Sequence, residues 1–250
     1  MPELPDVESA RRQIEERGLH RRIVGVYDGD SYVSRPHAPG EIAEALTGRE
    51  LVAAHRRGKS MWLETSGGGP ILGLHLGMAG RIAIDEEPSD QGWDRFVMRF
   101  ADGGSLALRD KRRLGRARLE PDIGALGPDA AEVTRPRFRE LMHRSRAPIK
   151  ARLMDQSVMA GIGNLMADEI LWRAYLDPRR AAEDLSDEEL DRLWREMRSI
   201  IRTSVRRGHA GITEMIPERR RDGHCPRCGT AMARATVGGR TTYWCPKEQH

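Results

Sequence analysis

The chain of 250 residues has few cysteines, few aromatic residues and almost no lysine. Only three cysteines are present, at Cys225, Cys228 and Cys245, which argues against a disulfide-stabilised secreted scaffold. No run approaches the ~20 apolar residues of a transmembrane helix, and the charged first residues lack the apolar core of a signal peptide. The sequence therefore predicts a soluble cytoplasmic protein without a membrane partner.

The charge balance gives only a weak indication of function. The formal net charge is +4, and nearly all basic side chains are arginine. Arginine abundance can follow from coding bias, so it is weak support for nucleic-acid binding. Lysine occurs only at Lys59, Lys111, Lys150 and Lys247, so each of these positions is more informative than the net charge.

The first half of the chain has the pattern of a β-rich domain. Short apolar or alternating runs are separated by Gly-rich or polar turns, which is typical of an antiparallel β-sandwich. A helix is expected over 41–46. The expected strands cover 23–27, 51–55, 60–65, 71–76, 81–84, 95–100, 105–108 and 116–119.

The second half is predicted to be helical, so the fold class is α+β. Residues 121–137 contain three prolines and no clear periodicity, which predicts a linker between a β-sandwich domain at 1–120 and a helical domain at 138–221. Helices are expected over 138–144, over 148–156, and from Ser186, where Ser186 and Glu189 form a capping box. Residues 222–250 are expected to form a β-hairpin.

The amino terminus combines a potential amine nucleophile with carboxylates. If Met1 is removed, Pro2 exposes a secondary amine whose attack on a sugar C1′ would give an iminium ion. Glu3 beside it could move the protons. The structural alternative is that Pro5 opens an ordinary amphipathic helix over 5–17, because apolar residues recur there at helical spacing.

This amino-terminal stretch resembles that of formamidopyrimidine-DNA glycosylases and their endonuclease VIII relatives. The resemblance implies that Pro2 is the nucleophile and Glu3 its acid/base partner. It also implies that the β-sandwich is the catalytic domain. The family usually has glutamate where this chain has Asp6, so Asp6 is left out of the catalytic set.

Three loops of the first half also match the family. The resemblance implies that Lys59 contacts phosphate near the lesion, and that His75 begins a loop whose Met78 enters the duplex. It further implies that Arg112 fills the space opposite the orphaned base, with Leu114 in place of the usual phenylalanine. The structural alternatives are that Lys59 is a solvated turn lysine, that Met78 packs in the core, and that the loop with Arg112 is simply a basic hairpin.

Two segments of the second half match the family as well. The glycine-containing turn 159–164 before a helix could present backbone N–H groups and the Asn164 amide to a phosphate, although a simple helix–helix turn is the alternative. It resembles the family's helix-two-turns-helix signature. Lys150 and Arg240 fall where the family has DNA-contacting residues, and solvated side chains are the alternative for both.

The cysteine spacing predicts one structural zinc ion. Cys225 and Cys228 form a complete knuckle, whereas Cys245 begins one whose second cysteine is replaced by Glu248. Glu248, His250 and His224 are candidates for the fourth ligand, because zinc accepts carboxylate and imidazole. The expected set is Cys225, Cys228, Cys245 and His250.

Six matches in order across the chain imply a bifunctional glycosylase and abasic-site lyase. It would act as a nucleoid-associated monomer on damaged double-stranded DNA, flip an oxidised base, attack through Pro2 and cut the strand by β/δ-elimination. The alternatives are a catalytically inactive damaged-DNA-binding protein and a zinc-ribbon RNA-binding module. The short stretch 206–224, together with Leu114, favours oxidised pyrimidines, hydantoins or abasic sites over 8-oxoguanine.

Overall fold

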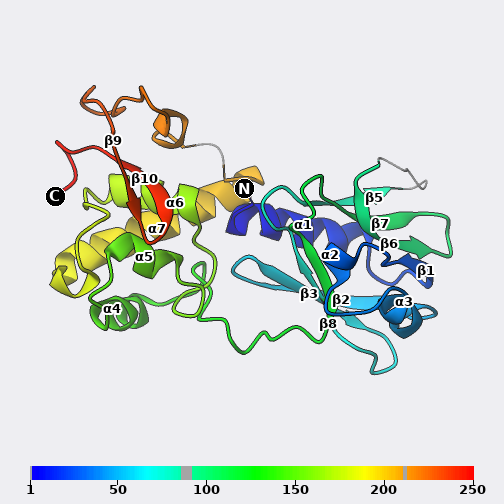
Figure 1. The fold of residues 1–250 in the computed structure, drawn as a ribbon. Coiled ribbons are helices and arrows are strands. Elements are labelled where there is room, and N and C mark those ends of the chain that lie inside the picture. The colour runs from blue at the N-terminus through cyan, green and yellow to red at the C-terminus, as the bar shows by residue number, and fades with distance from the viewer. Residues whose placement is uncertain (1, 86–91, 211–212) are drawn as a thin grey trace. The chain divides into compact units, whose positions relative to one another are not determined.

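The computed structural model describes residues 2–85, 92–210 and 213–250, and Figure 1 shows the order of their elements. The chain divides into two compact units. Unit 1 comprises Met1–Pro2 and Asp6–Ile123, and unit 2 comprises Glu3–Pro5 and Gly124–His250. Both are mixed, with antiparallel strands and helices, which confirms the α+β expectation. Residues 211 and 212 of the expected short stretch 206–224 lie outside the described residues.

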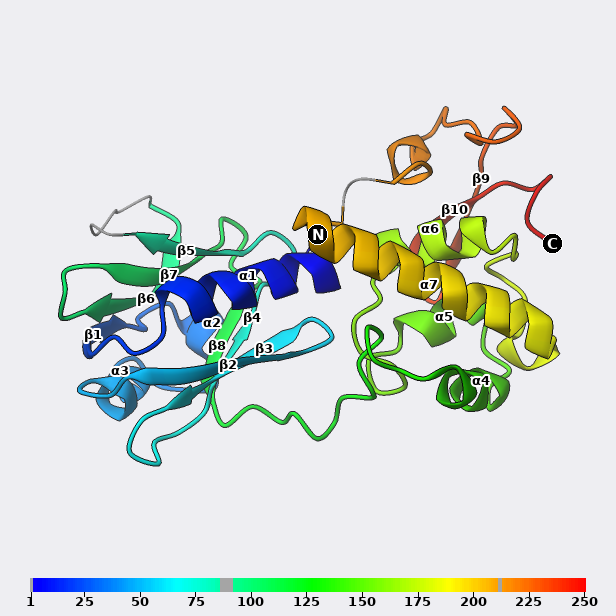
Figure 2. The ribbon, with the colours of Figure 1, turned by 180° about the vertical axis from the view of Figure 1, so that it is seen from behind.

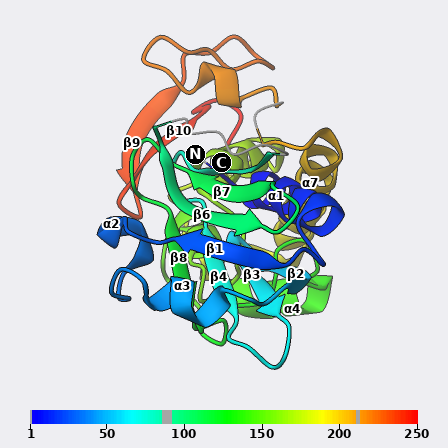
Figure 3. The ribbon, with the colours of Figure 1, turned by 90° about the vertical axis from the view of Figure 1, so that its right-hand side faces the viewer.

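Within the described part of unit 1, two four-stranded antiparallel sheets are present, and Figure 3 shows β1, β6 and β7 as neighbours in the first of them. The first sheet has the order β1-β6-β7-β5 and the second the order β2-β3-β4-β8. The bounds are β1 (Ile23–Tyr27), β2 (Leu51–Arg57), β3 (Ser60–Thr65), β4 (Leu72–His75), β5 (Arg81–Asp85), β6 (Asp94–Phe100), β7 (Ser105–Arg109) and β8 (Arg116–Leu119).

The core of unit 1 follows from side-chain alternation. Phe96, Met98 and Phe100 of β6 are buried on one face of the strand, and the intervening residues are more exposed. Helix α1 (Leu4–Arg17) adds Val7 and Ile14 from one helical face to the same core. The strands and the helix were therefore readable from the period of their apolar residues.

One helix of unit 1 was not predicted. Helix α2 (Ser31–Ser34) has only four residues, and the side chain of Asp30 caps it by accepting a hydrogen bond from the Tyr32 N–H. A single turn is too short for an apolar period, so only the capping residue marks it. Helix α3 (Glu41–Leu46) lies where expected.

Unit 2 is built around its longest helix, α7 (Asp187–Arg207), which packs against α4 and α6 (Figure 2). Ser186 and Glu189 form the predicted capping box. Helix α4 begins before the expected residue 138, because Pro136 occupies its first turn. The other elements are α4 (Arg135–His143), α5 (Ile149–Met154), α6 (Asn164–Arg173), η1 (Ala182–Asp184), η2 (Ile216–Glu218), β9 (Ala233–Val237) and β10 (Arg240–Trp244).

None of the helices described has both the length and the apolar character needed to cross a bilayer.

Candidate active site

Pro2 lines a pocket of about 290 Å³ in unit 1. The other walls come from the β2–β3 turn, which supplies Lys59, from the end of β4, which supplies His75, and from two loops that supply Met78 and Leu114. Pro2 is half-buried. The pocket therefore gathers the expected amine and four of the expected DNA-contacting or catalytic side chains of this unit around one space.

His75 is held as a neutral imidazole in this pocket. Burial lowers its pKa, and the positive charges of Lys59, Arg116 and Arg118 lower it further. Its Nδ1 accepts a hydrogen bond from the Gly77 N–H at 3.0 Å. Because Nδ1 is the acceptor, the ring proton resides on Nε2, so His75 can donate one hydrogen bond from Nε2.

The loop carrying Met78 packs directly on the loop carrying Leu114. A Cβ atom at Gly77 would lie 2.4 Å from the Leu114 carbonyl carbon, and Gly77 has a positive φ of 61°. Only glycine fits such a contact in that conformation. Met78 and Leu114 are 43% and 38% exposed, so two large apolar side chains face solvent at one pocket. The core alternative for Met78 does not hold.

A buried carboxylate shapes the second loop. Asp110 is 1% exposed and accepts hydrogen bonds from the backbone N–H groups of Arg112, Leu114 and Gly115. Arg113 is held by Asp30 through its guanidinium. In the described structure, Arg112 is exposed and has no ion pair, so it is available to a ligand. Sequence reasoning missed Asp110, although an Asp before a short turn is a known turn signal.

Glu8 fastens α1 to the second sheet of unit 1. Its carboxylate accepts hydrogen bonds from Arg11 and Arg12 on the same helix and from Arg56 on β2. Burial alone would raise the pKa of Glu8, but the hydrogen bonds from Arg11, Arg56 and Arg12 outweigh it and lower the pKa from 4.5 to about 2. The helix that begins beside Pro2 is thereby anchored.

Replacing Glu8 with glutamine should reduce stability in a pH-dependent way. A carboxyl group with a lowered folded-state pKa stabilises the fold above its unfolded pKa, and this contribution disappears as the pH falls through the folded value. We expect E8Q to lose at most about 3 kcal/mol of unfolding free energy near pH 6, since one pKa unit corresponds to about 1.4 kcal/mol. Urea unfolding of both proteins at pH 6 and pH 3 measures this, and a difference that does not shrink at pH 3 would contradict the ion-pair explanation.

Glu3 lies at the amino-terminal end of α6 in unit 2. Its carboxylate is 0% exposed, and its Oε1 accepts hydrogen bonds from the N–H groups of Leu165 at 3.0 Å and Met166 at 3.4 Å. A Cβ atom at Gly163 would lie 2.2 Å from Glu3 Oε2. The glycine therefore makes room for the carboxylate, and the N–H groups fix its orientation.

This arrangement modifies the expectation for the turn 159–164. The N–H groups of Leu165 and Met166, which follow the turn, bind the Glu3 carboxylate, because a helix amino terminus stabilises a nearby anion. Within the turn, the Gly161 N–H donates to Gln156 Oε1. Asn164 is the first residue of α6 and is half-buried. The side-chain amide of Asn164 could still donate a hydrogen bond to a phosphate.

The structure places Lys150 in the interior, not on the expected DNA surface. Its ammonium is 0% exposed, lies 2.6 Å from Asp168 Oδ1 and donates a hydrogen bond to the Thr242 hydroxyl at 2.7 Å. Burial lowers the pKa of Lys150, whereas Asp168 opposes that shift. Lys150 sits in the first turn of α5 and faces α6 and β10, so its chain position could not reveal whether its side chain points outward.

Arg240 begins β10 directly after the hairpin turn. Gly238 and Gly239 both have positive φ, as a tight hairpin turn requires, and a Cβ atom at Gly238 would lie 2.8 Å from the Ala151 Cβ. The hairpin tip therefore packs on α5. Arg240 is exposed and forms no ion pair among the residues described.

The three cysteines come together, but the expected fourth ligand does not join them. The Sγ atoms of Cys225, Cys228 and Cys245 lie within 4.8 Å of one another. No ligand atom of His250, Glu248 or His224 joins this group, although all three were among the described residues. His250 therefore stays a prediction as the fourth ligand; its backbone is bonded to Tyr175 and Asp177, and the preceding Gln249 is bonded to Cys245.

Comparison with known proteins identifies the family. The model of the formamidopyrimidine-DNA glycosylase N-terminal domain matches residues 1–117, and that of the formamidopyrimidine-DNA glycosylase H2TH domain matches residues 125–215. The chain belongs to the formamidopyrimidine-DNA glycosylase family. The formamidopyrimidine-DNA glycosylase of Roseiflexus sp. (strain RS-1) is 35% identical over 100% of both chains, and that of Arabidopsis thaliana is 32% identical over 100% of this chain and 71% of its own.

Solved structures of the family are similar along the whole chain. The Lactococcus lactis formamidopyrimidine-DNA glycosylase bound non-covalently to DNA with an abasic site has a TM-score of 0.86 at 28% identity, with 99% of both chains covered. A structure of MutM with DNA containing carbocyclic 8-oxoguanine has a TM-score of 0.86 at 27% identity, with both chains fully covered. The expected resemblance to this glycosylase family is confirmed.

Proposed function

We propose that the chain is a bifunctional DNA glycosylase and abasic-site lyase that uses the Pro2 amine as its nucleophile. The observation that carries the proposal is the pocket in which Pro2 lies beside Lys59, His75, Met78 and Leu114. Family membership supports the glycosylase part of the proposal. The lyase part is supported by the chemistry of the residues.

The proposed reaction proceeds through an iminium ion. The Pro2 nitrogen forms a bond to C1′ while the bond from C1′ to the base breaks, and the base leaves with a proton. Ring opening gives a cationic iminium, which acidifies the C2′–H bond. Loss of that proton breaks the C3′–O bond and releases the 3′ phosphate, and a second elimination breaks the C5′–O bond. Water then hydrolyses the remaining iminium and frees Pro2.

The residues around Pro2 have distinct proposed roles. Glu3 follows Pro2 in the chain. Its fixed carboxyl group would protonate the opening sugar ring from its acid form, and the resulting carboxylate would take up the proton lost later from C2′. Neutral His75 would donate from Nε2 to a phosphate or sugar oxygen. Lys59 would neutralise phosphate charge next to the reacting sugar.

Damaged duplex DNA is the proposed partner, and the Lactococcus lactis relative is bound to DNA that contains an abasic site. Met78 and Leu114 are exposed apolar side chains that could fill the gap left by a flipped nucleotide, and Arg112 could occupy the space beside the orphaned base. Asn164 and Arg240 are proposed phosphate contacts in unit 2. Lys150 is not included, because its ammonium is buried.

Borohydride trapping on duplex DNA with an abasic site tests this mechanism. Borohydride reduces the iminium to a stable amine, so protein with a verified Pro2 amino terminus should become covalently attached to DNA. The matched control carries one extra residue before Pro2, which converts the nucleophilic nitrogen into an amide. We expect no adduct from the control but unchanged DNA affinity.

Absence of an adduct from the protein with free Pro2 would overturn the enzyme proposal. If such a protein still bound abasic DNA more tightly than undamaged DNA, the alternative of an inactive damaged-DNA-binding protein would be favoured. That alternative does not explain why Pro2 lines the pocket and Glu3 is held so firmly.

We also propose that the three cysteines hold one zinc ion. The Sγ atoms of Cys228 and Cys245 are 3.6 Å apart, close to the separation of about 3.8 Å that two thiolates bound tetrahedrally to zinc require. Cys225 and Cys245 are buried, so their thiolates need a counter-charge that zinc would supply. The described residues supply three ligands to the ion.

Elemental analysis should find about one zinc per chain. Cys245→Ser should lose most of the metal, because serine is a poor zinc ligand. His250→Ala serves as the control and should keep its zinc, since His250 lies outside the cysteine group. A large loss of zinc in the His250 variant would instead restore the sequence-based ligand set.

The preferred base stays a prediction. Leu114 can wedge but cannot stack as phenylalanine does, and the short stretch 206–224 would offer fewer backbone donors to a flipped purine. Both features favour oxidised pyrimidines, hydantoins or abasic sites over 8-oxoguanine.

A further inference from the structure

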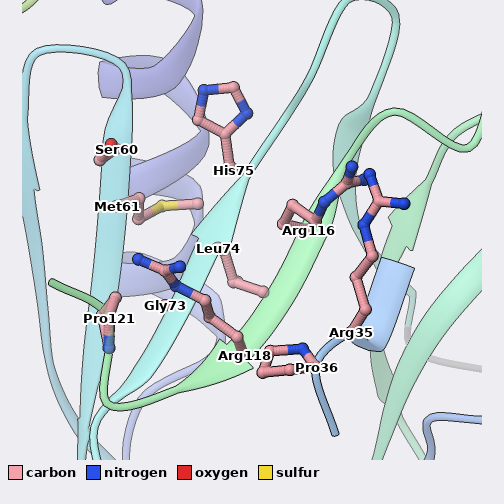
Figure 4. A pocket seen from close by; sticks show the side chains of 10 residues that line it. All are labelled: Arg35, Pro36, Ser60, Met61, Gly73, Leu74, His75, Arg116, Arg118 and Pro121. Atoms are coloured by element: carbon pink, nitrogen blue, oxygen red, sulfur yellow. The ribbon is translucent and has the colours of Figure 1, made fainter. Parts of the chain in front are cut away.

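A second, larger pocket of about 500 Å³ lies on the β2-β3-β4-β8 sheet of unit 1. We call it the arginine pocket, because its walls carry Arg35, Arg116 and Arg118, together with Ser60 and His75 (Figure 4). His75 also lines the Pro2 pocket, so the two spaces share a wall. The arginine pocket is therefore next to the proposed reaction site and separate from it.

The hollow follows from the strand register. Arg118 on β8 pairs with Gly73 on β4, so no side chain rises from β4 at that point. A Cβ atom at Gly73 would lie 2.7 Å from Pro121, which forms part of the pocket wall. The glycine keeps the proline close to the sheet and leaves space beside the arginines.

No carboxylate is among the residues that line this pocket. None of its three arginines forms an ion pair among the residues described, although many other arginines of the chain do. Arg116 donates one hydrogen bond, to the Gly115 carbonyl oxygen. Burial lowers the pKa of Arg116, and the neighbouring charge of Arg35 lowers it further, while Asp110 opposes part of that shift. Like charges are thus held together around an open space, where an anion would be attracted.

Phosphate is the anion that fits this set of donors. Guanidinium groups present paired N–H donors that match the oxygens of a phosphate, and the Ser60 hydroxyl would add a neutral donor. A carboxylate offers only two oxygens to three cations. The shared wall with the Pro2 pocket would place a bound phosphate near the reacting nucleotide.

We propose that the arginine pocket is a further phosphate-binding site, which takes a phosphodiester of duplex DNA outside the lesion or a small free phosphate compound. The DNA form of this proposal rests on the proposed function, whereas the small-phosphate form does not.

The test compares two charge-matched variants. Arg35→Gln/Arg118→Gln removes two charges from the pocket, and both side chains are exposed and make no described hydrogen bond, so folding should be kept. Arg17→Gln/Arg99→Gln removes two exposed charges elsewhere in unit 1. Binding to undamaged duplex is measured from low to moderate salt, and binding of inorganic pyrophosphate is measured by calorimetry.

We expect the pocket variant to lose pyrophosphate binding. Its plot of log binding constant against log salt should be shallower by about 0.9 for each phosphate contact removed, that is by up to about 1.8 for two contacts. The control variant should keep the pyrophosphate affinity and most of the slope. The thermal midpoint of the pocket variant should not fall, because unpaired like charges are removed.

The outcomes separate the two phosphate sources. Loss of pyrophosphate binding with an unchanged duplex slope would support the site and assign it to small phosphates. A pocket variant indistinguishable from the control in both measurements would overturn the proposal. Undamaged duplex involves no chemistry, so failure of the Pro2 reaction would leave these binding results unaffected and would show up only in borohydride trapping.

Discussion

Replacing Gly163 with alanine should lower single-turnover base excision at least about 100-fold, the size expected when a general acid/base is displaced. The added Cβ atom would lie 2.2 Å from Glu3 Oε2 and 2.5 Å from its Cδ. The Glu3 carboxylate is 0% exposed and bonded to the first turn of α6, so it cannot move aside without losing those bonds. The substitution therefore acts on Glu3 although it touches neither Pro2 nor DNA.

Single-turnover rates of G163A, Glu3→Gln and the double variant distinguish this mechanism from general damage. If Gly163 acts only through Glu3, the double variant should be no slower than Glu3→Gln alone. Gly25→Ala is the control, because a Cβ atom there meets nothing within 4 Å. Duplex affinity should stay within a few-fold of the parent protein. Excision by G163A at the parent rate would show that the position of Glu3 is unimportant.

The family and most of the helices and strands could be predicted from sequence. Strands such as β6 could be predicted because their apolar residues alternate along the chain, as their burial then shows. Helix α7 could be predicted from its capping box and its long apolar face. Cys225, Cys228 and Cys245 come together as their spacing predicted. These features depend on residues close together in the chain, so the local backbone geometry alone determines them.

The rest depended on contacts between residues far apart in the chain. No local pattern shows that Gly163 must be small because Glu3 lies against it, 160 positions away along the chain. A lysine in the first turn of a helix gives the same sequence pattern whether it faces water or a carboxylate, so the burial of Lys150 could not be foreseen. Nor could the sequence show that His250 would lie outside the group formed by the three cysteine sulfur atoms, since backbone bonds to Tyr175 and Asp177 help to place the chain end.

Removing one partner of the buried pair Lys150–Asp168 should destabilise unit 2 more than breaking an exposed ion pair does. Both side chains are 0% exposed, and Asp168 also accepts hydrogen bonds from Arg219 at 2.8 Å and from the Tyr243 N–H of β10 at 3.2 Å. Burial raises the pKa of Asp168, while Lys150 and Arg219 oppose that shift. The buried Asp168 carboxylate on α6 thus connects this helix to α5 and to the β9–β10 hairpin.

We expect Asp168→Asn to cost about 3–5 kcal/mol of unfolding free energy, because it removes the carboxylate that is paired with the buried Lys150. Lys150→Met should cost less, since Asp168 keeps Arg219, and the double variant should lose less than the sum of the two. Denaturant unfolding of zinc-loaded protein measures all three. The exposed pair Arg146–Glu183 provides the control, and Glu183→Gln should change stability by less than about 1 kcal/mol. A loss of unfolding free energy in Asp168→Asn as small as in the control would show that the ion pair does not hold the β9–β10 hairpin on α5 and α6. In that case the packing of the hairpin tip on Ala151 would be what positions Arg240.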